Sequence, residues 1–92
     1  MTEDEIYKAA LDKWGHGFQI GMAMTEAGEL IAALGRFIIQ NRNNAEEVID
    51  ELADMEIMLC QMRYLFDEEK INGRKEQKLL RLRAMVQGVA DE

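Results

Sequence analysis

The sequence predicts a single all-α domain. Three observations favour this class: the 92-residue chain contains no proline, 48% of its residues are hydrophobic, and apolar residues recur at intervals of three and four. Proline breaks helices because it removes a backbone N–H donor. Spacings of three and four place side chains on one face of a helix. We therefore expect four helices of unequal length within one domain spanning residues 1–92.

Glycines separate the first two expected helices. Thr2 and Glu5 form a capping-box pattern, which predicts a first helix ending at about residue 13. The segment WGHG at 14–17 predicts a turn, because it holds two glycines within four residues. The second helix is expected from about residue 18 to residue 40. Its apolar stripe comprises Ile20, Ala23, Met24, Ala27, Ile31, Leu34 and Ile38.

Three glycines lie seven residues apart in the second helix, at Gly21, Gly28 and Gly35. A glycine inside a helix costs up to ~1 kcal/mol relative to alanine. Close approach of another helix is the expected reason for keeping three of them.

The second half of the chain predicts two more helices. NRNN at 41–44 predicts a turn, and Asn44 with Glu47 resembles a second capping box before a helix over about 45–66. DEEKING at 67–73 is expected to loosen the chain before a fourth helix over about 74–87. The third helix is apolar nearly all round, so we expect it to be buried on most sides. Three short partners cannot cover it, which favours a four-helix bundle completed by homo-oligomerisation as a dimer or tetramer.

The composition excludes several classes of function. With a net charge of −7, the chain is not expected to bind a nucleic acid polymer, which requires clustered Lys and Arg. The same charge attracts a divalent cation. No apolar run approaches ~18 residues, so neither a membrane span nor a signal peptide is expected. Cys60 is the single cysteine and forms no internal disulfide, which favours a reducing compartment and a cytoplasmic location.

Two acidic pairs define the candidate site. Glu26 and Glu29 lie three apart in the second helix, and Glu51 and Asp54 lie three apart in the third. Antiparallel packing of these helices would bring four carboxylates together, and all-oxygen ligation suits Mg²⁺, with Mn²⁺ as an alternative. Solvated surface charge is the competing interpretation. A di-iron site is disfavoured because no Glu precedes a His by three residues, and zinc is disfavoured by the shortage of His and Cys.

With these residues in place, the chain resembles the MazG-like nucleotide pyrophosphohydrolases, an all-α family. The family pattern is Glu-Glu-x-x-Glu, a spacer, and Glu-x-x-Asp, which TEAGE at 25–29 and ELAD at 51–54 match. Thr25 departs from the pattern, because the family usually has a first Glu there. KWG at 13–15, AGELIAAL in the second helix, EVIDELADMEIML in the third and a basic C-terminal helix extend the resemblance over most of the chain.

The resemblance implies an enzyme that hydrolyses nucleoside or deoxynucleoside triphosphates to a monophosphate and pyrophosphate. It implies that Mg²⁺ is held by the four carboxylates at positions 26, 29, 51 and 54. Phosphoryl transfer depends mainly on positioning and charge neutralisation. The candidate proton acceptors for the attacking water are Glu47 and Asp50.

Three further residues are candidates for binding substrate. Lys78 and Arg81 share a face of the fourth helix, where the family has basic residues that contact phosphate; ordinary surface charge is the alternative. Trp14 can stack on a base, or it caps the core from a turn. Two other functions stay open for the whole chain. One is a catalytically silent MazG-like interaction module, which Thr25 keeps possible, and the other is a structural four-helix protein without metal.

Overall fold

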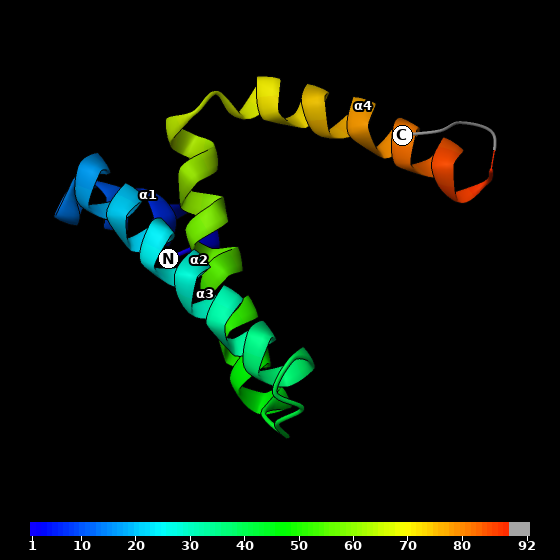
Figure 1. Ribbon diagram of the computed structural model, residues 1–92. Coiled ribbons are helices and arrows are strands. Elements are labelled where there is room, and N and C mark those ends of the chain that lie inside the picture. Colours follow the sequence, from blue (N-terminus) through cyan, green and yellow to red (C-terminus); the bar gives the residue numbers. More distant parts are fainter. Residues whose placement is uncertain (89–92) are drawn as a thin grey trace.

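The protein is built entirely of helices over residues 1–88, the part of the chain that the computed structural model describes (Figure 1). This confirms the predicted all-α class. The helices, in order, are α1 (Glu3–Trp14), α2 (His16–Ile38), α3 (Ala45–Leu65) and α4 (Glu68–Val86).

The start of α1 is the predicted capping box. The Thr2 hydroxyl accepts a hydrogen bond from the Glu5 backbone N–H at 3.1 Å, and the Glu5 carboxylate accepts one from the Thr2 N–H at 3.3 Å. Gly15 alone separates α1 from α2, with a φ of 88° that other residues rarely adopt. Because one residue suffices for the turn, α2 begins at His16, two residues earlier than predicted.

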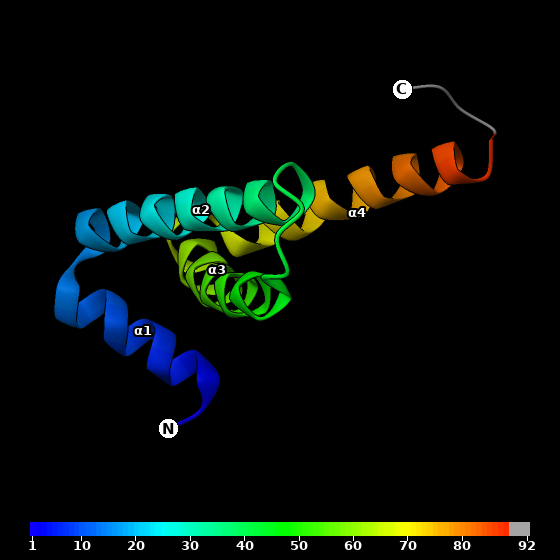
Figure 2. The ribbon, with the colours of Figure 1, turned by 60° about the horizontal axis from the view of Figure 1, so that its bottom comes forward.

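The core lies where α1 and α3 pack against α2, and its buried apolar residues are Tyr7, Leu11, Ala23, Ala33 and Met58. Figure 2 shows α2 and α3 side by side, with α1 set against them. Ala33 is 0% exposed, and its small side chain lets the two long helices approach closely. The face of α2 that carries Ala23 and Ala33 is therefore the inner one. Ile31 and Ile38 of the predicted apolar stripe lie on the exposed face instead.

A buried polar contact ties α2 to α3 near the start of α2. The side-chain amide of Gln19 donates to Gln61 Oε1 at 2.7 Å, and Gln61 Nε2 donates to Met58 Sδ at 3.8 Å. Both glutamines are buried. A buried amide without a partner is costly, so this contact favours a single alignment of the two helices.

The fourth helix differs from the expectation in both its start and its packing. Asp67, with a φ of 61°, caps it by accepting a hydrogen bond from the Lys70 N–H at 3.2 Å, so α4 begins at Glu68 rather than near residue 74. It buries none of its described residues and runs away from the other helices (Figure 1). The radius of gyration is accordingly 16.4 Å, against ~12 Å for a compact domain of this length.

The third helix is less covered than its composition predicts. Its buried residues are Met58 and Gln61, whereas Ile49, Leu52, Ile57 and Leu59 are exposed within one chain. The expectation that α3 is buried on most sides is therefore not met by the other helices of the same chain. Among residues 1–88, none of the helices has the length and apolar content needed to cross a membrane.

The buried hydrogen bond between Gln19 and Gln61 predicts how substitutions at these two positions change the free energy of unfolding. Gln61→Ala should lower the free energy of unfolding by about 1–3 kcal/mol, because it leaves the buried Gln19 amide without a partner. The double variant Gln19→Leu/Gln61→Leu should recover most of that loss, since it removes both polar groups together. Urea unfolding followed by circular dichroism measures both changes. Equal losses in the two variants would contradict this account.

Candidate metal site

The antiparallel packing of α2 and α3 brings three acidic side chains together. Glu26, Glu51 and Asp54 can each offer a carboxylate oxygen such that the three oxygens lie within 4.8 Å of one another. Glu26 and Glu51 are half-buried between the helices, and Asp54 is exposed at the edge of the group. These three residues are called the acidic triad below. They are three of the four metal ligands that the sequence predicts.

Burial and mutual repulsion make the ionised form of the triad unfavourable. The pKa of Glu26 is raised first by burial and then by the charges of Asp54 and Glu29. The pKa of Glu51 is raised by burial, then by the charges of Glu29, Glu26 and Asp54, and by a hydrogen bond with Glu29 that favours its protonated form. Like charges in a partly desolvated site disfavour ionisation, so the arrangement favours an added proton or a cation.

The fourth predicted ligand lies at the margin of this group. Glu29 is exposed and is not one of the three residues whose oxygens converge. Its charge nevertheless raises the pKa of both Glu26 and Glu51. Glu29 therefore lies near the triad without belonging to it.

Two buried carboxylate oxygens without hydrogen-bond partners among residues 1–88 indicate whether these residues fit a metal ion. Glu26 Oε2 and Glu51 Oε2 are both inaccessible to solvent, and neither has a hydrogen-bond partner in the described part of the chain. Buried polar atoms normally have partners, and such exceptions call for an explanation. Carboxylate oxygens are the ligands of Mg²⁺ and Mn²⁺. A divalent cation would satisfy both atoms and neutralise the charge, so the donor set fits.

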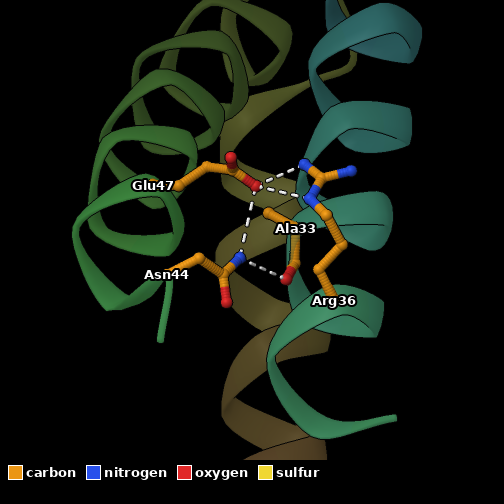
Figure 3. A network of polar contacts seen from close by, with 4 residues as sticks. All are labelled: Ala33, Arg36, Asn44 and Glu47. Carbon is orange, nitrogen blue, oxygen red and sulfur yellow. Dashed lines mark hydrogen bonds and ion pairs between the residues drawn. The ribbon is translucent and has the colours of Figure 1, made fainter. Parts of the chain in front are cut away.

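A second polar network holds the other end of the α2–α3 pair (Figure 3). Glu47 Oε1 accepts hydrogen bonds from Arg36 Nε at 2.9 Å and from Asn44 Nδ2 at 3.3 Å, and it also pairs with Arg36 Nη2. Asn44 Nδ2 donates to the Ala33 carbonyl at 3.1 Å as well. The Arg36 guanidinium, through its hydrogen bonds, is the main cause of the lowered pKa of Glu47.

This network shows that the predicted capping box at Asn44 is absent, and it occupies one oxygen of Glu47, a predicted proton acceptor. Asn44 precedes α3 but makes no side-chain capping hydrogen bond, so the predicted capping box with Glu47 is absent. The Asn44 amide is held by α2 instead. Glu47, a predicted proton acceptor, uses one oxygen to hold Arg36 and Asn44. The other predicted acceptor, Asp50, is exposed on α3 one turn before Asp54.

The three predicted substrate-binding residues lie on other elements. Lys78 and Arg81 are on α4, which packs against α3 and not against α2. Lys78 lines an open hollow of about 610 Å³ between α4 and the end of α3, together with Phe66, Lys70, Ile71, Arg74, Lys75, Leu79 and Leu82. Trp14 is the exposed last residue of α1, and the Lys13 ammonium lies 5.2 Å from the centre of its ring. The structure of one chain therefore does not bring these residues together with the triad.

Sequence reasoning missed the polar contacts that align the two helices. Gln19 and Gln61 are 42 residues apart, and Arg36 and Glu47 are 11 apart across a turn. The available signal was a pair of amide-bearing residues at otherwise apolar helix positions. It identifies a buried polar residue but not its partner.

Comparison with family models, with curated proteins and with solved structures gave no match for this chain.

The raised pKa values predict how the metal-free protein responds to pH. A carboxyl group whose folded pKa lies above its ordinary value of 4.5 gives stability that is complete below that value and is lost as pH rises through the folded pKa. In EDTA, the melting temperature of the parent protein should therefore fall as the pH rises above the ordinary carboxyl pKa of 4.5 and through the raised pKa values of Glu26 and Glu51. Glu51→Gln should flatten this dependence, because it removes one charge from the triad.

Glu56→Gln is the matched control for that measurement. Glu56 is an exposed glutamate on the same helix and is not part of the triad. It should keep the parental pH dependence in thermal melts. If Glu51→Gln and Glu56→Gln behave alike, the carboxylates of the triad do not interact strongly.

Proposed function

We propose that the chain is a Mg²⁺-dependent pyrophosphohydrolase of the MazG-like type. It hydrolyses nucleoside or deoxynucleoside triphosphates to a monophosphate and pyrophosphate, and Mn²⁺ can replace Mg²⁺. The acidic triad carries the proposal, because two of its buried oxygens have no partner among residues 1–88 and the pKa values of two of its carboxyls are raised. Carboxylates that are merely solvated surface charge would have neither buried oxygens without partners nor raised pKa values.

The proposed ligands are Glu26, Glu51 and Asp54, with Glu29 completing the set. When bound, Mg²⁺ supplies charge neutralisation for the phosphate oxygens and Lewis acidity. The half-buried triad would hold the cation at a fixed position against α2 and α3, and the anionic phosphate would be attracted to that cation rather than to the carboxylates. Water then attacks the α-phosphorus in line, the bond from that phosphorus to the bridging oxygen breaks, and pyrophosphate leaves with the bond's electron pair.

A carboxylate outside the triad is needed to take the proton from the attacking water. Asp50 and Glu47 are the two candidates, and their surroundings differ. Asp50 is exposed on α3, whereas Glu47 is bound to Arg36 and Asn44 and has a lowered pKa. A lowered pKa makes a weaker base. We therefore assign the proton acceptor to Asp50 and a supporting role to Glu47.

The proposal includes self-association as a dimer or tetramer, because the substrate needs cations that α4 carries. From Lys70 to Arg83 this helix has six basic residues and one acidic residue, whereas the whole chain has a net charge of −7. A basic helix that extends from an acidic body complements the body of a second copy. In such an assembly Lys78 and Arg81 would contact the triphosphate, and Trp14 would stack on its base. A single free cysteine, Cys60, agrees with a cytoplasmic location.

Turnover and metal-linked stability together test the function. With millimolar Mg²⁺, a panel of canonical and damaged (d)NTPs should yield pyrophosphate, and Mg²⁺ should raise the melting temperature by mass action. Glu26→Gln should remove the thermal shift and lower kcat/KM by at least about a hundredfold, because removing a ligand should cost at least as much as removing its outer-shell partner. Glu56→Gln should change neither quantity.

The two measurements separate the competing functions. A thermal shift without turnover of any triphosphate would assign the chain to a catalytically silent metal-binding module. An equal thermal shift in Glu26→Gln would reduce the metal effect to ionic screening and leave a structural helical protein.

The two candidate bases are distinguished by opposite phenotypes. Asp50→Asn should lower kcat by about 10²–10⁴-fold, the usual contribution of a general base, and leave the melting temperature near the parental value. Glu47→Gln should lower the melting temperature, because the Arg36 guanidinium loses its charged partner, with a smaller effect on kcat. Steady-state kinetics and thermal melts of both variants check this assignment. The reverse pattern would make Glu47 the base.

A further inference from the structure

The outer face of α2 carries a regular pattern that no other element among residues 1–88 contacts. Glycines and large apolar residues alternate along it at spacings of three and four, in the order Gly21, Met24, Gly28, Ile31, Gly35 and Ile38. An apolar repeat that averages 3.5 residues is the signature of a helix pairing with another helix along its length. We call these six residues the α2 seam.

The seam points away from the rest of the chain. Met24, Ile31 and Ile38 are 72%, 71% and 75% exposed, whereas Ala23 and Ala33, on the opposite side of α2, are buried. A Cβ atom added at any of the three glycines would meet nothing within 4 Å. Within the described part of the chain, no helix therefore makes the close approach to these glycines that the sequence predicts for another helix.

The seam is also free of charge, in a chain in which 32% of residues are charged. The residues that border it include Ile20, Ala27 and Ala32. The three charged residues Glu26, Glu29 and Arg36 of α2 lie on other faces. Glu26 belongs to the triad, Glu29 lies near it, and Arg36 is paired with Glu47. An uncharged face that spans about 26 Å of helix, at 1.5 Å per residue, is long enough for a partner helix.

The order of residues in the seam is self-complementary. When two copies of α2 are set antiparallel about a two-fold axis midway between residues 29 and 30, Gly21 lies opposite Ile38, Met24 opposite Gly35, and Gly28 opposite Ile31. Each large side chain then faces a glycine of the other copy. This arrangement lets the backbones approach to about 8 Å, the short end of the range for packed helices. A parallel pair would instead place glycine against glycine and leave voids.

We propose that the α2 seam is a homodimer interface, formed by antiparallel pairing of α2 with α2 of a second copy. The partner is a second copy because the pattern matches itself under a two-fold axis, which is what an isologous interface requires. A lipid surface fits less well, because helices that lie on membranes have Lys and Arg beside the apolar face. Within α2, Arg36 is the only Lys or Arg. The interface lies on the side of α2 away from the triad and does not depend on metal.

Sedimentation equilibrium at micromolar concentration, in EDTA, tests the interface independently of the enzymatic function. The parent chain should form a dimer or larger assembly. Ile31→Lys should at least halve its mean molar mass without loss of helix content, because it places a charge in the central layer. Ile57→Lys is the matched control, since Ile57 is exposed on α3 outside the seam, and it should keep the parental mass.

A second variant replaces a glycine of the seam with a large apolar residue and adds no charge. Gly28→Leu should raise the dissociation constant of the dimer at least tenfold. The added side chain would meet Ile31 of the other copy, where the parent chain has a glycine. In an isolated chain the same change meets open space and favours the helix. A parent chain that is monomeric, or that is unaffected by both Ile31→Lys and Gly28→Leu, overturns the proposal. A monomer that floats with phospholipid vesicles would assign the face to lipid instead.

The direction of pairing is tested by a spin label on Gln40→Cys in a Cys60→Ser background. Residue 40 lies two residues beyond the end of α2, so antiparallel pairing separates the two labelled backbones by about 30 Å along the axis, at 1.5 Å per residue. Parallel pairing would place them about 10 Å apart, the distance between packed helix axes. Double electron–electron resonance that reports the shorter distance overturns the antiparallel arrangement.

Discussion

The alignment of α2 against α3 is the constraint on which the candidate site depends. Two polar contacts set it: the Gln19–Gln61 pair near one end, and Arg36 with Glu47 near the other. Glu26 and Glu51 lie between these contacts, about two turns from Gln19 and one turn from Glu47 respectively. A slip of one helix by a single turn would leave each buried amide without its partner and would separate the triad. The apolar contacts alone are less selective, because a face of alanines fits several alignments.

The same alignment forces the carboxylates of the acidic triad together against their mutual repulsion. Three carboxylates brought within 4.8 Å repel one another, and burial of two of them makes the repulsion worse. The energy that holds them there comes from contacts elsewhere on the two helices. Functional sites commonly contain such locally unfavourable groups, held by a surrounding structure that is more stable than the site itself.

Local sequence signals predicted the number of helices, the start of α1 and the break at residue 15, but they placed the start of α4 about six residues too late. The Thr2 capping box, the glycine turn at residue 15 and the three-residue spacing of the carboxylates each act within one turn of helix, so the sequence contains all that is needed. The inner face of α2 was not predictable in the same way. Its large residues, such as Ile31, outweigh Ala23 and Ala33 in an apolar pattern, yet the alanines are buried because they allow a closer approach. Asn44 was misread for a similar reason: its nearest partners in space lie on α2, not in its own helix.

The junction between α3 and α4, which consists of Phe66 and Asp67 alone, has an evolutionary consequence. In one chain α4 buries none of its described residues, so substitutions along it have no core contacts to disturb. Changes in the sequence of this helix would therefore leave the geometry of α2 and α3 intact. The positions of α2 and α3 that bring the carboxylates together are constrained by packing, whereas those of α4 are not. Proteins that share the acidic triad could therefore differ most in α4.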